Sequence, residues 1–169
     1  MLSAKRSSVS SAALSEGVSV VLRGVDPDYD PTVRKAGASP AAVLAADAKG
    51  VSGVLLGKEL QRRLSVEPGD VLRLVVLDLG GKRPRFRYLS VRFAGAFATG
   101  FAEFDASWVI IDRQVLLRAR GATGLDVMEL KLDDPRQTDA VAGRVEETLG
   151  SDWLVQRWQT LNRQLFAAL

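Results

Sequence analysis

The 169-residue sequence contains no cysteine and no histidine. The lack of cysteine excludes disulfide bonds, thiolate metal sites and cysteine nucleophiles. The lack of histidine excludes Ser-His-Asp triads, histidine general bases and nearly all zinc enzymes. A glycine–lysine phosphate loop and a GxGxxG motif are also missing, which argues against nucleotide binding by either device. We therefore expect no catalytic residue, no cofactor and no metal in this chain.

Long hydrophobic runs and a strong net charge are missing too. No stretch reaches about 18 apolar residues, so nothing in the sequence is expected to span a bilayer. The 23 basic and 20 acidic residues leave a net charge of only +3, so nucleic acid is not the default partner. Hydrophobic residues make up 47% of the chain, which is ordinary for a folded protein and argues against disorder.

The first two thirds of the sequence alternate short apolar runs with glycine and proline turns. Strands are expected over 17–25, 54–56, 70–77, 85–98 and 108–111. Helices are expected over 39–46, 57–64 and 112–118, the last capped by Asp112. The run Val66-Glu67-Pro68-Gly69-Asp70 predicts a tight turn. Strands at this spacing indicate a small, twisted, mainly antiparallel sheet.

The last third of the sequence has a different pattern. Residues 126–132 alternate, which predicts a strand with Met128, Leu130 and Leu132 pointing inward. A helix follows from the Asp134-Pro135 cap to Gly150, and a further strand is expected around 153–155. These elements form a βαβ unit followed by a final helix. We therefore predict an α+β fold, with a β-rich subdomain over 1–123 and a βαβ-plus-helix subdomain over 124–169.

Acidic residues at alternate positions suggest a calcium loop at Asp26, Asp28 and Asp30. Pro31 and Gly37 stand where such a loop needs glycine and glutamate, so calcium binding is rejected.

Glu103 and Asp105 are a possible acid–base pair, although an acidic turn between strands is the favoured interpretation. Gly57 and Gly69 are expected to serve the backbone, through close approach or positive φ. Asp70 is expected to cap a turn.

The stretch Lys82-Arg83-Pro84-Arg85-Phe86-Arg87-Tyr88 combines cations with aromatic residues. Such a combination can bind nucleic acid, because cations neutralise phosphates and aromatic rings stack on bases. Strand alternation supports another interpretation, in which Phe86 and Tyr88 pack on one face and the arginines are solvated on the other.

Four segments, in this order, resemble the LolC/LolE-type lipoprotein-releasing ABC transporter permeases of the FtsX-like family. The run 23–27 (RGVDP) is similar to the strand-ending xGVDP of that family. The run 56–72 resembles its LGxxLAxxLxVxxGDxVxL stretch, and 97–105 resembles its FxxGxxEYD segment. Residues 158–169 match the WxxxNxxLFxAL that leads into the second transmembrane helix in that family.

The resemblance implies a periplasmic domain of an inner-membrane permease, with a Sabre-like subdomain over 1–123 and a Porter-like subdomain over 124–169. Implied partners are a second permease subunit, a cytoplasmic ABC ATPase that hydrolyses the ATP, a lipoprotein and a LolA-like carrier. The membrane would be reached through flanking helices absent from this sequence. The implied activity is coupling of ATPase-driven motion to lipoprotein release.

The resemblance also implies two functional regions. A projecting hairpin of the family corresponds to partner-binding residues at a hairpin tip: Lys82, Arg83, Pro84, Arg85 and Arg87. The connection is shorter here than is typical of the family. Membrane-proximal coupling residues are expected near the C-terminal end: Trp158, Asn162, Leu165 and Phe166.

One departure from the family concerns the N-terminal end. Members have a further half-domain before the GVDP strand, whereas only about 16 residues precede it here. We expect an excised or reduced domain whose βαβ unit is open to self-association. Other hypotheses are a periplasmic domain of a MacB- or FtsX-type permease, a nucleic-acid-binding β domain and, least favoured, an acid–base enzyme.

Overall fold

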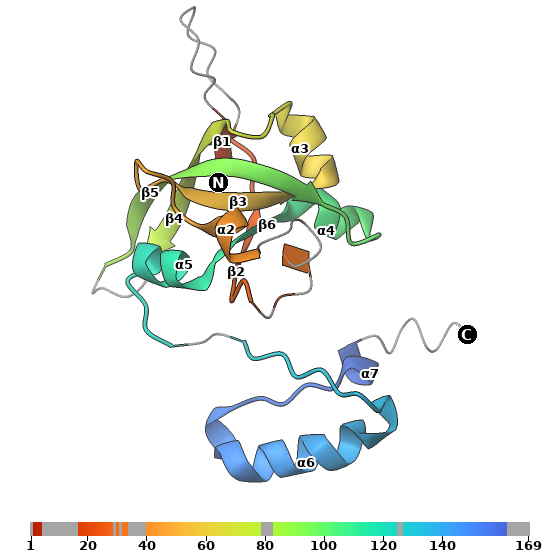
Figure 1. Ribbon diagram of the computed structural model, residues 1–169. Coiled ribbons are helices and arrows are strands. Elements are labelled where there is room, and N and C mark those ends of the chain that lie inside the picture. The colour runs from red at the N-terminus through yellow and green to blue at the C-terminus, as the bar shows by residue number, and fades with distance from the viewer. Residues whose placement is uncertain are drawn as a thin grey trace, which may run out of the picture. The chain divides into compact units, whose positions relative to one another are not determined.

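A mixed six-stranded sheet organises the residues up to Gly124 in the computed structural model (Figure 1). The structure describes residues 2–4, 17–28, 30, 32–33, 40–78, 83–124 and 127–161. The strands are β1 (Leu2–Ala4), β2 (Val21–Val25), β3 (Ser52–Gly57), β4 (Val71–Asp78), β5 (Arg85–Phe97) and β6 (Trp108–Asp112). Their order in the sheet is β1-β4-β5-β3-β6-β2.

The sheet is more mixed than the sequence analysis predicted. The pairs β1/β4, β4/β5 and β3/β6 are antiparallel, but β2/β6 and β3/β5 are parallel. Each parallel pair joins strands that are separated in the sequence by other elements, because parallel neighbours cannot be linked by a tight hairpin. Three of the five pairings are thus antiparallel, in line with the mainly antiparallel expectation, and the pairings of β2 with β6 and of β3 with β5 are the exceptions.

Local chemistry explains where the strands and turns lie. Every residue of β3 is buried, as expected for a central strand, whereas β4 alternates between exposed and buried positions. The turn before β4 forms as predicted. Gly69 has φ 102°, and the Asp70 carboxylate accepts a hydrogen bond from the Glu67 N–H at 2.9 Å. The expected role of Asp70 as a turn cap is confirmed.

The helices bounded within the described part of this unit are short: α2 (Pro40–Leu44), α3 (Lys58–Leu64), α4 (Ala102–Ser107) and α5 (Arg113–Arg120). The Asp112 carboxylate accepts hydrogen bonds from the N–H groups of Gln114 and Val115, which confirms the predicted N-cap of α5. Helix α5 ends at Gly121, whose φ of 62° terminates it in the left-handed region.

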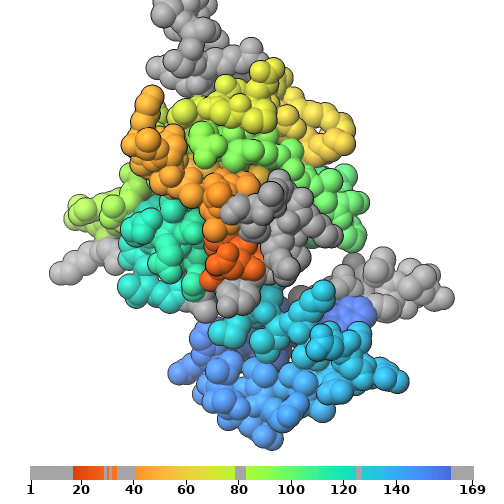
Figure 2. Space-filling model, in the orientation of Figure 1, coloured from red at the N-terminus to blue at the C-terminus, as the bar shows by residue number. Residues whose placement is uncertain are grey.

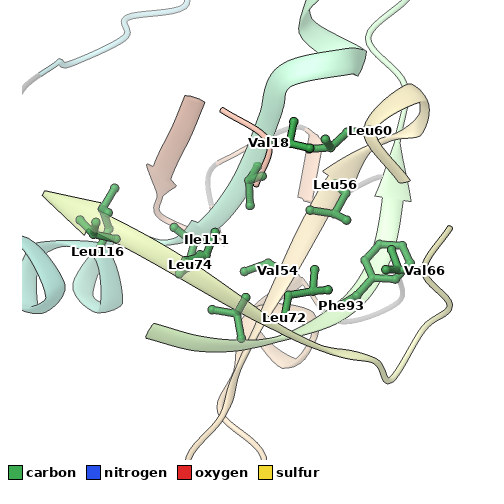
Figure 3. Close-up of a cluster of buried hydrophobic side chains, with 13 residues drawn as sticks. Val18, Val54, Leu56, Leu60, Val66, Leu72, Leu74, Phe93, Ile111 and Leu116 are labelled. Atoms are coloured by element: carbon green, nitrogen blue, oxygen red, sulfur yellow. The ribbon is translucent and has the colours of Figure 1, made fainter. Parts of the chain in front are cut away.

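The main core lies between the sheet and its helices. Buried side chains from several strands gather there, among them Val54, Leu56, Leu74, Phe93 and Ile111 (Figure 3). Leu60 of α3 and Leu116 of α5 belong to the same cluster. Each such side chain contributes about 1.5–3 kcal/mol when it is fully buried. A second, smaller cluster contains Val33, Leu44, Leu55 and Ile110.

The chain divides into two compact units, Met1–Gly124 and Leu125–Leu169. The second unit contains helix α6 (Thr138–Leu149), preceded by the 3-10 turn η1 (Pro135–Gln137) and followed by η2 (Gly150–Asp152) and α7 (Trp158–Leu161). The Asp134 carboxylate accepts a hydrogen bond from the Arg136 N–H at 3.0 Å, and Gly150 follows the last residue of α6. The predicted start and end of this helix are thus confirmed.

The predicted βαβ unit is absent from the described part of the second unit. Residues 127–132 and 153–157 are neither strand nor helix, and Met128 and Leu130 are exposed rather than buried. Alternation alone does not make a strand, because the backbone N–H and C=O groups also need a neighbouring strand. Two parallel strands without further partners are marginal.

Candidate functional site: the β4–β5 arm

The β4–β5 hairpin extends beyond the strands on either side of it. Pairing of β5 with β3 begins at Val91, and pairing of β4 with β1 covers only Leu72–Leu74. Within the described residues, Val75–Asp78 and Arg85–Tyr88 therefore pair only with each other. We call this two-stranded extension, with Arg83 and Pro84, the arm. In Figure 2 the start of β5 projects from the side of its unit, at the left of the view.

One face of the arm is apolar and exposed. Leu77 lies opposite Phe86, and Val75 lies opposite Tyr88, so these four side chains share one face. Phe86 is 71% exposed, Tyr88 70% and Leu77 43%. We call these four residues the aromatic face. The prediction that Phe86 and Tyr88 pack was wrong, because within the described residues the opposite face of the arm, with Val76 and Asp78, is the buried one.

The opposite face of the arm carries an ion pair near its outer end. Arg87 Nε lies 2.8 Å from Asp78 Oδ2, and the Asp78 side chain is buried. The Asp78 carboxylate also lies against Gly121 at the end of α5, where a Cβ atom would come within 3.1 Å of Oδ1. Arg87, which lies opposite Val76, is two positions inward from the outermost strand pair and is engaged by Asp78.

The tip itself carries the other predicted partner-binding residues. Arg83, Pro84 and Arg85 are exposed, as a partner-binding role requires, and Lys82 lies outside the described residues. No aspartate or glutamate occurs between Asp78 and Arg92 in the sequence. Arg73 lies opposite Ser90, on the same side of the sheet as the aromatic face but nearer the root of the arm. Its cationic side chain is also exposed. The arm is therefore an apolar face bordered by positive charge.

A second arrangement joins two of the sequence segments singled out above. A Cβ atom at Gly57 would lie 2.2 Å from the backbone oxygen of Asp105, so only glycine allows α4 to approach β3 this closely. The expected backbone role of Gly57 is confirmed. The segments 56–72 and 97–105 thus meet at one contact.

Asp105 stabilises the loop before α4. Its carboxylate accepts hydrogen bonds from the Thr99 N–H and the Thr99 hydroxyl, each at 2.8 Å. These hydrogen bonds, the one from the Thr99 N–H above all, lower the pKa of Asp105 although its burial opposes the shift. Glu103 and Asp105 lie in α4, not in a turn between strands, and Glu103 is exposed. The Asp105 carboxylate therefore binds Thr99, and it does not form a buried acid–base pair with Glu103.

The three aspartates at 26–30 also have structural roles where they are described. Asp30 is buried and accepts hydrogen bonds from the N–H groups of Thr32 and Val33. Asp26 lies 3.6 Å from Arg113, on α5. No group of three or more acidic side chains in the described residues is placed to hold a metal ion.

An aromatic row on α4 was not predicted from the sequence. Phe101 lies 5.6 Å from Phe104, and Phe104 stacks on Trp108 at 4.4 Å between ring centroids. The guanidinium of Arg23 lies 4.8 Å above the Trp108 ring. The spacing of three and four residues along a helix was the signal that could have found this row.

Comparisons with known proteins identify a relationship. No protein-family model matches the chain. Over 127 residues it is 31% identical to the lipoprotein-releasing system transmembrane protein LolC of Xylella fastidiosa strain Temecula1, and equally to that of strain 9a5c. The resemblance to LolC-type permeases is confirmed. Each match covers 71% of this chain but only 30% of the LolC relative, so the chain corresponds to a minor part of that protein.

The LolC relatives are named as transmembrane proteins, whereas none of the helices in the described residues is long and apolar enough to cross a membrane. The segment predicted to lead towards a membrane begins with Trp158, which opens α7 and is about half exposed. Asn162, Leu165 and Phe166 lie outside the described residues.

Proposed function

We propose that the chain is the periplasmic domain of a LolC-type permease of the inner membrane. In this proposal the first unit is the Sabre-like subdomain and the second unit belongs to a Porter-like subdomain, as in MacB-like permeases. The support is the similarity to LolC over 71% of the chain together with the projecting arm. Relatives named LolC favour this branch over the MacB and FtsX types.

The proposed activity is mechanical, and the domain itself catalyses no reaction. A cytoplasmic ABC ATPase hydrolyses ATP, and the permease helices convey the resulting motion to this domain through the region that begins at Trp158. A second permease subunit and a lipoprotein complete the assembly. A domain that transmits displacement must be stiff, and the close packing of β3, β5 and β6 around Phe93 and Ile111 supports this role.

The arm is proposed as the docking site for a LolA-like lipoprotein carrier. It projects past the sheet, its tip carries Arg83 and Arg85, and Pro84 fixes the local backbone. The observation that carries the proposal is the unshared pairing of Val75–Asp78 with Arg85–Tyr88, which extends the ribbon and leaves the aromatic face open, while the other face carries the buried Val76 and Asp78.

The experiment replaces residues 75–88, which include the whole arm, by a two-residue Asn-Gly turn that keeps a favoured hairpin connection between Leu74 and Leu89. We expect a folded domain with a lower melting temperature, because Val76 and Asp78 are buried, and loss of carrier crosslinking and of lipoprotein release from membranes that contain the whole transporter. The matched control places Asn-Gly at residues 122–123, outside the arm. Full carrier crosslinking and release by the shortened-arm transporter would overturn the proposal.

Nucleic-acid binding is the second candidate, because Phe86 and Tyr88 are exposed and the exposed Arg83 and Arg85 precede them in the sequence. Such a site would bind oligonucleotides with a steep dependence on salt concentration. We expect no binding of a single-stranded oligonucleotide in 150 mM salt, about physiological strength. Tight binding that weakens steeply with added salt would favour this second function over the first.

A further inference from the structure

We infer that the aromatic face of the arm, rather than the arginines at its tip, supplies most of the affinity for the carrier, and that the matching carrier surface is an apolar patch bordered by carboxylates. This inference rests on the proposed function of the arm. It assigns the contact to Phe86 and Tyr88, with Leu77 and Val75 beside them, none of which the sequence analysis had placed in the binding site.

Exposure and position support these residues as the centre of an interface. Phe86 and Tyr88 are about two thirds or more exposed, and each has an apolar cross-strand neighbour on the same face. Neighbours at this spacing form a continuous apolar surface. Tyrosine and other large aromatic residues dominate binding energy when they are buried at the centre of an interface, while surrounding polar residues contribute less.

The charges around the face indicate the chemistry of the partner. Arg83 and Arg85 lie at the tip and Arg73 lies towards the root, while Arg87 is engaged by Asp78. Among the described residues Arg73, Arg83 and Arg85 form no ion pair, although Arg85 lies opposite Asp78 in the strand register. A complementary partner therefore carries acidic groups around an apolar centre. Charges at the rim of an interface mainly change the association rate and its salt dependence.

The arm also holds the aromatic face in one orientation before any partner binds. Strand β5 is continuous from Arg85 to Phe97, so the arm is a direct extension of the strand that carries the buried Val91 and Phe93. The Asp78–Arg87 pair and the contact of Asp78 with Gly121 fix the outer end of the strands against the end of α5. A rigid surface loses less conformational entropy on binding, which favours affinity.

The experiment measures the Kd of the 169-residue chain for the purified LolA-like carrier at low and high salt. One variant is Phe86→Ser with Tyr88→Ser, and another is Arg83→Ser with Arg85→Ser. Phe101→Ser is the matched control, because Phe101 is 65% exposed but lies outside the arm, immediately before α4. All substituted side chains are exposed, so thermal melting should confirm that each variant is folded.

We expect the aromatic double variant to bind about tenfold or more weakly at both salt concentrations. The arginine double variant should keep most of its affinity at high salt but lose the salt dependence of the association rate. Phe101→Ser should bind like the unaltered chain.

Three results would overturn the inference. Unchanged binding by the aromatic variant, with loss in the arginine variant, overturns the inference alone and leaves the proposed docking function intact. Absence of carrier binding by the unaltered chain overturns both. Binding to phosphatidylglycerol vesicles, or dimer formation in light scattering, that depends on Phe86 and Tyr88 while carrier binding does not, assigns the face to a lipid surface or a second copy instead.

Discussion

The two units of the chain differ in how much apolar surface they bury. In the first unit, β3, β5 and β6 enclose a core of fully buried side chains. In the described part of the second unit, Ala142 is the only buried hydrophobic residue, and several large apolar residues are exposed: Val127, Met128, Leu130, Leu149, Trp153, Leu154 and Trp158. The central strands of a sheet can bury side chains on both faces of the sheet, whereas a single helix flanked by extended segments buries few side chains. We therefore expect the second unit to open locally at lower free energy than the first.

Replacing a leucine by alanine should have the most different effects on stability in the two units. Leu56→Ala removes a fully buried side chain from the first unit and should lower the free energy of unfolding by about 2–5 kcal/mol. Leu154→Ala removes a side chain that is 82% exposed and should change it by less than about 0.5 kcal/mol. Urea unfolding followed by circular dichroism measures both. Equal losses in the two variants would show that the second unit has a core of its own.

Glycine replacement gives the next largest contrast. Gly57→Ala places a methyl group against the backbone of Asp105 and should lower stability by about 1–3 kcal/mol. Gly143 lies within α6, and an added Cβ atom would have no other atom within 4 Å. Gly143→Ala should therefore raise helix stability by about 0.5–1 kcal/mol. Thermal melting of both variants checks the opposite signs. A neutral Gly57→Ala would mean that α4 moves away from β3 without cost.

The helix caps offer a smaller contrast of the same kind. Asp112→Ala removes the acceptor for two N–H groups at the start of α5 and should lower stability by about 1 kcal/mol. Asp134→Ala removes the equivalent acceptor before α6 and should speed hydrogen exchange at Arg136 with little change in global unfolding. Hydrogen exchange with mass spectrometry, beside urea unfolding, separates the local from the global effect. A global loss from Asp134→Ala as large as that from Asp112→Ala would contradict the contrast.

The smallest expected effect is the change in stability with pH that Asp105 causes. The Thr99 N–H and hydroxyl lower the pKa of Asp105, so its charged form adds stability above the unfolded pKa of about 3.9, and this is lost as pH falls through the folded value. Asp105→Asn keeps an acceptor for Thr99, so we expect a small loss at neutral pH that vanishes in strong acid. Urea unfolding at several pH values measures it.

Asp134 provides the counterpart in the second unit. The pKa of the Asp134 carboxyl is lowered chiefly by its hydrogen bond with the guanidinium of Arg136, and the Arg136 side chain is exposed. Added salt should therefore weaken the contribution of Asp134 while leaving that of the buried Asp105 nearly unchanged. Equal salt sensitivity at both positions would contradict this difference in environment.

The sequence predicted the elements whose signals are local. The Asp112 cap, the Pro68-Gly69 turn and the strand over 85–98 each depend on neighbouring residues, and all three are confirmed. The parallel pairing of β2 with β6 could not be predicted, because nothing near Val21 specifies Trp108 as its partner. The strand expected over 126–132 was wrong because alternation says nothing about whether a pairing strand is present.

The candidate site was predicted in part. The hairpin and its exposed Arg83, Pro84 and Arg85 were located from the motif order and turn residues. The aromatic face was missed, because alternation shows that Phe86 and Tyr88 share a face but not whether anything covers it. That depends on where β3 and β1 stop pairing with their neighbours, which is a property of the whole sheet.

The pairing of β2 with β6 also has a consequence for how the first unit is made. Val21 emerges from the ribosome long before Trp108, its partner, so β2 has no neighbour until most of this unit has been synthesised. Contacts between residues so distant in sequence slow folding, because a long loop must close first. A growing chain therefore carries an incomplete sheet with an open edge for much of its synthesis, and chaperones that shield extended apolar segments should associate with it during that interval.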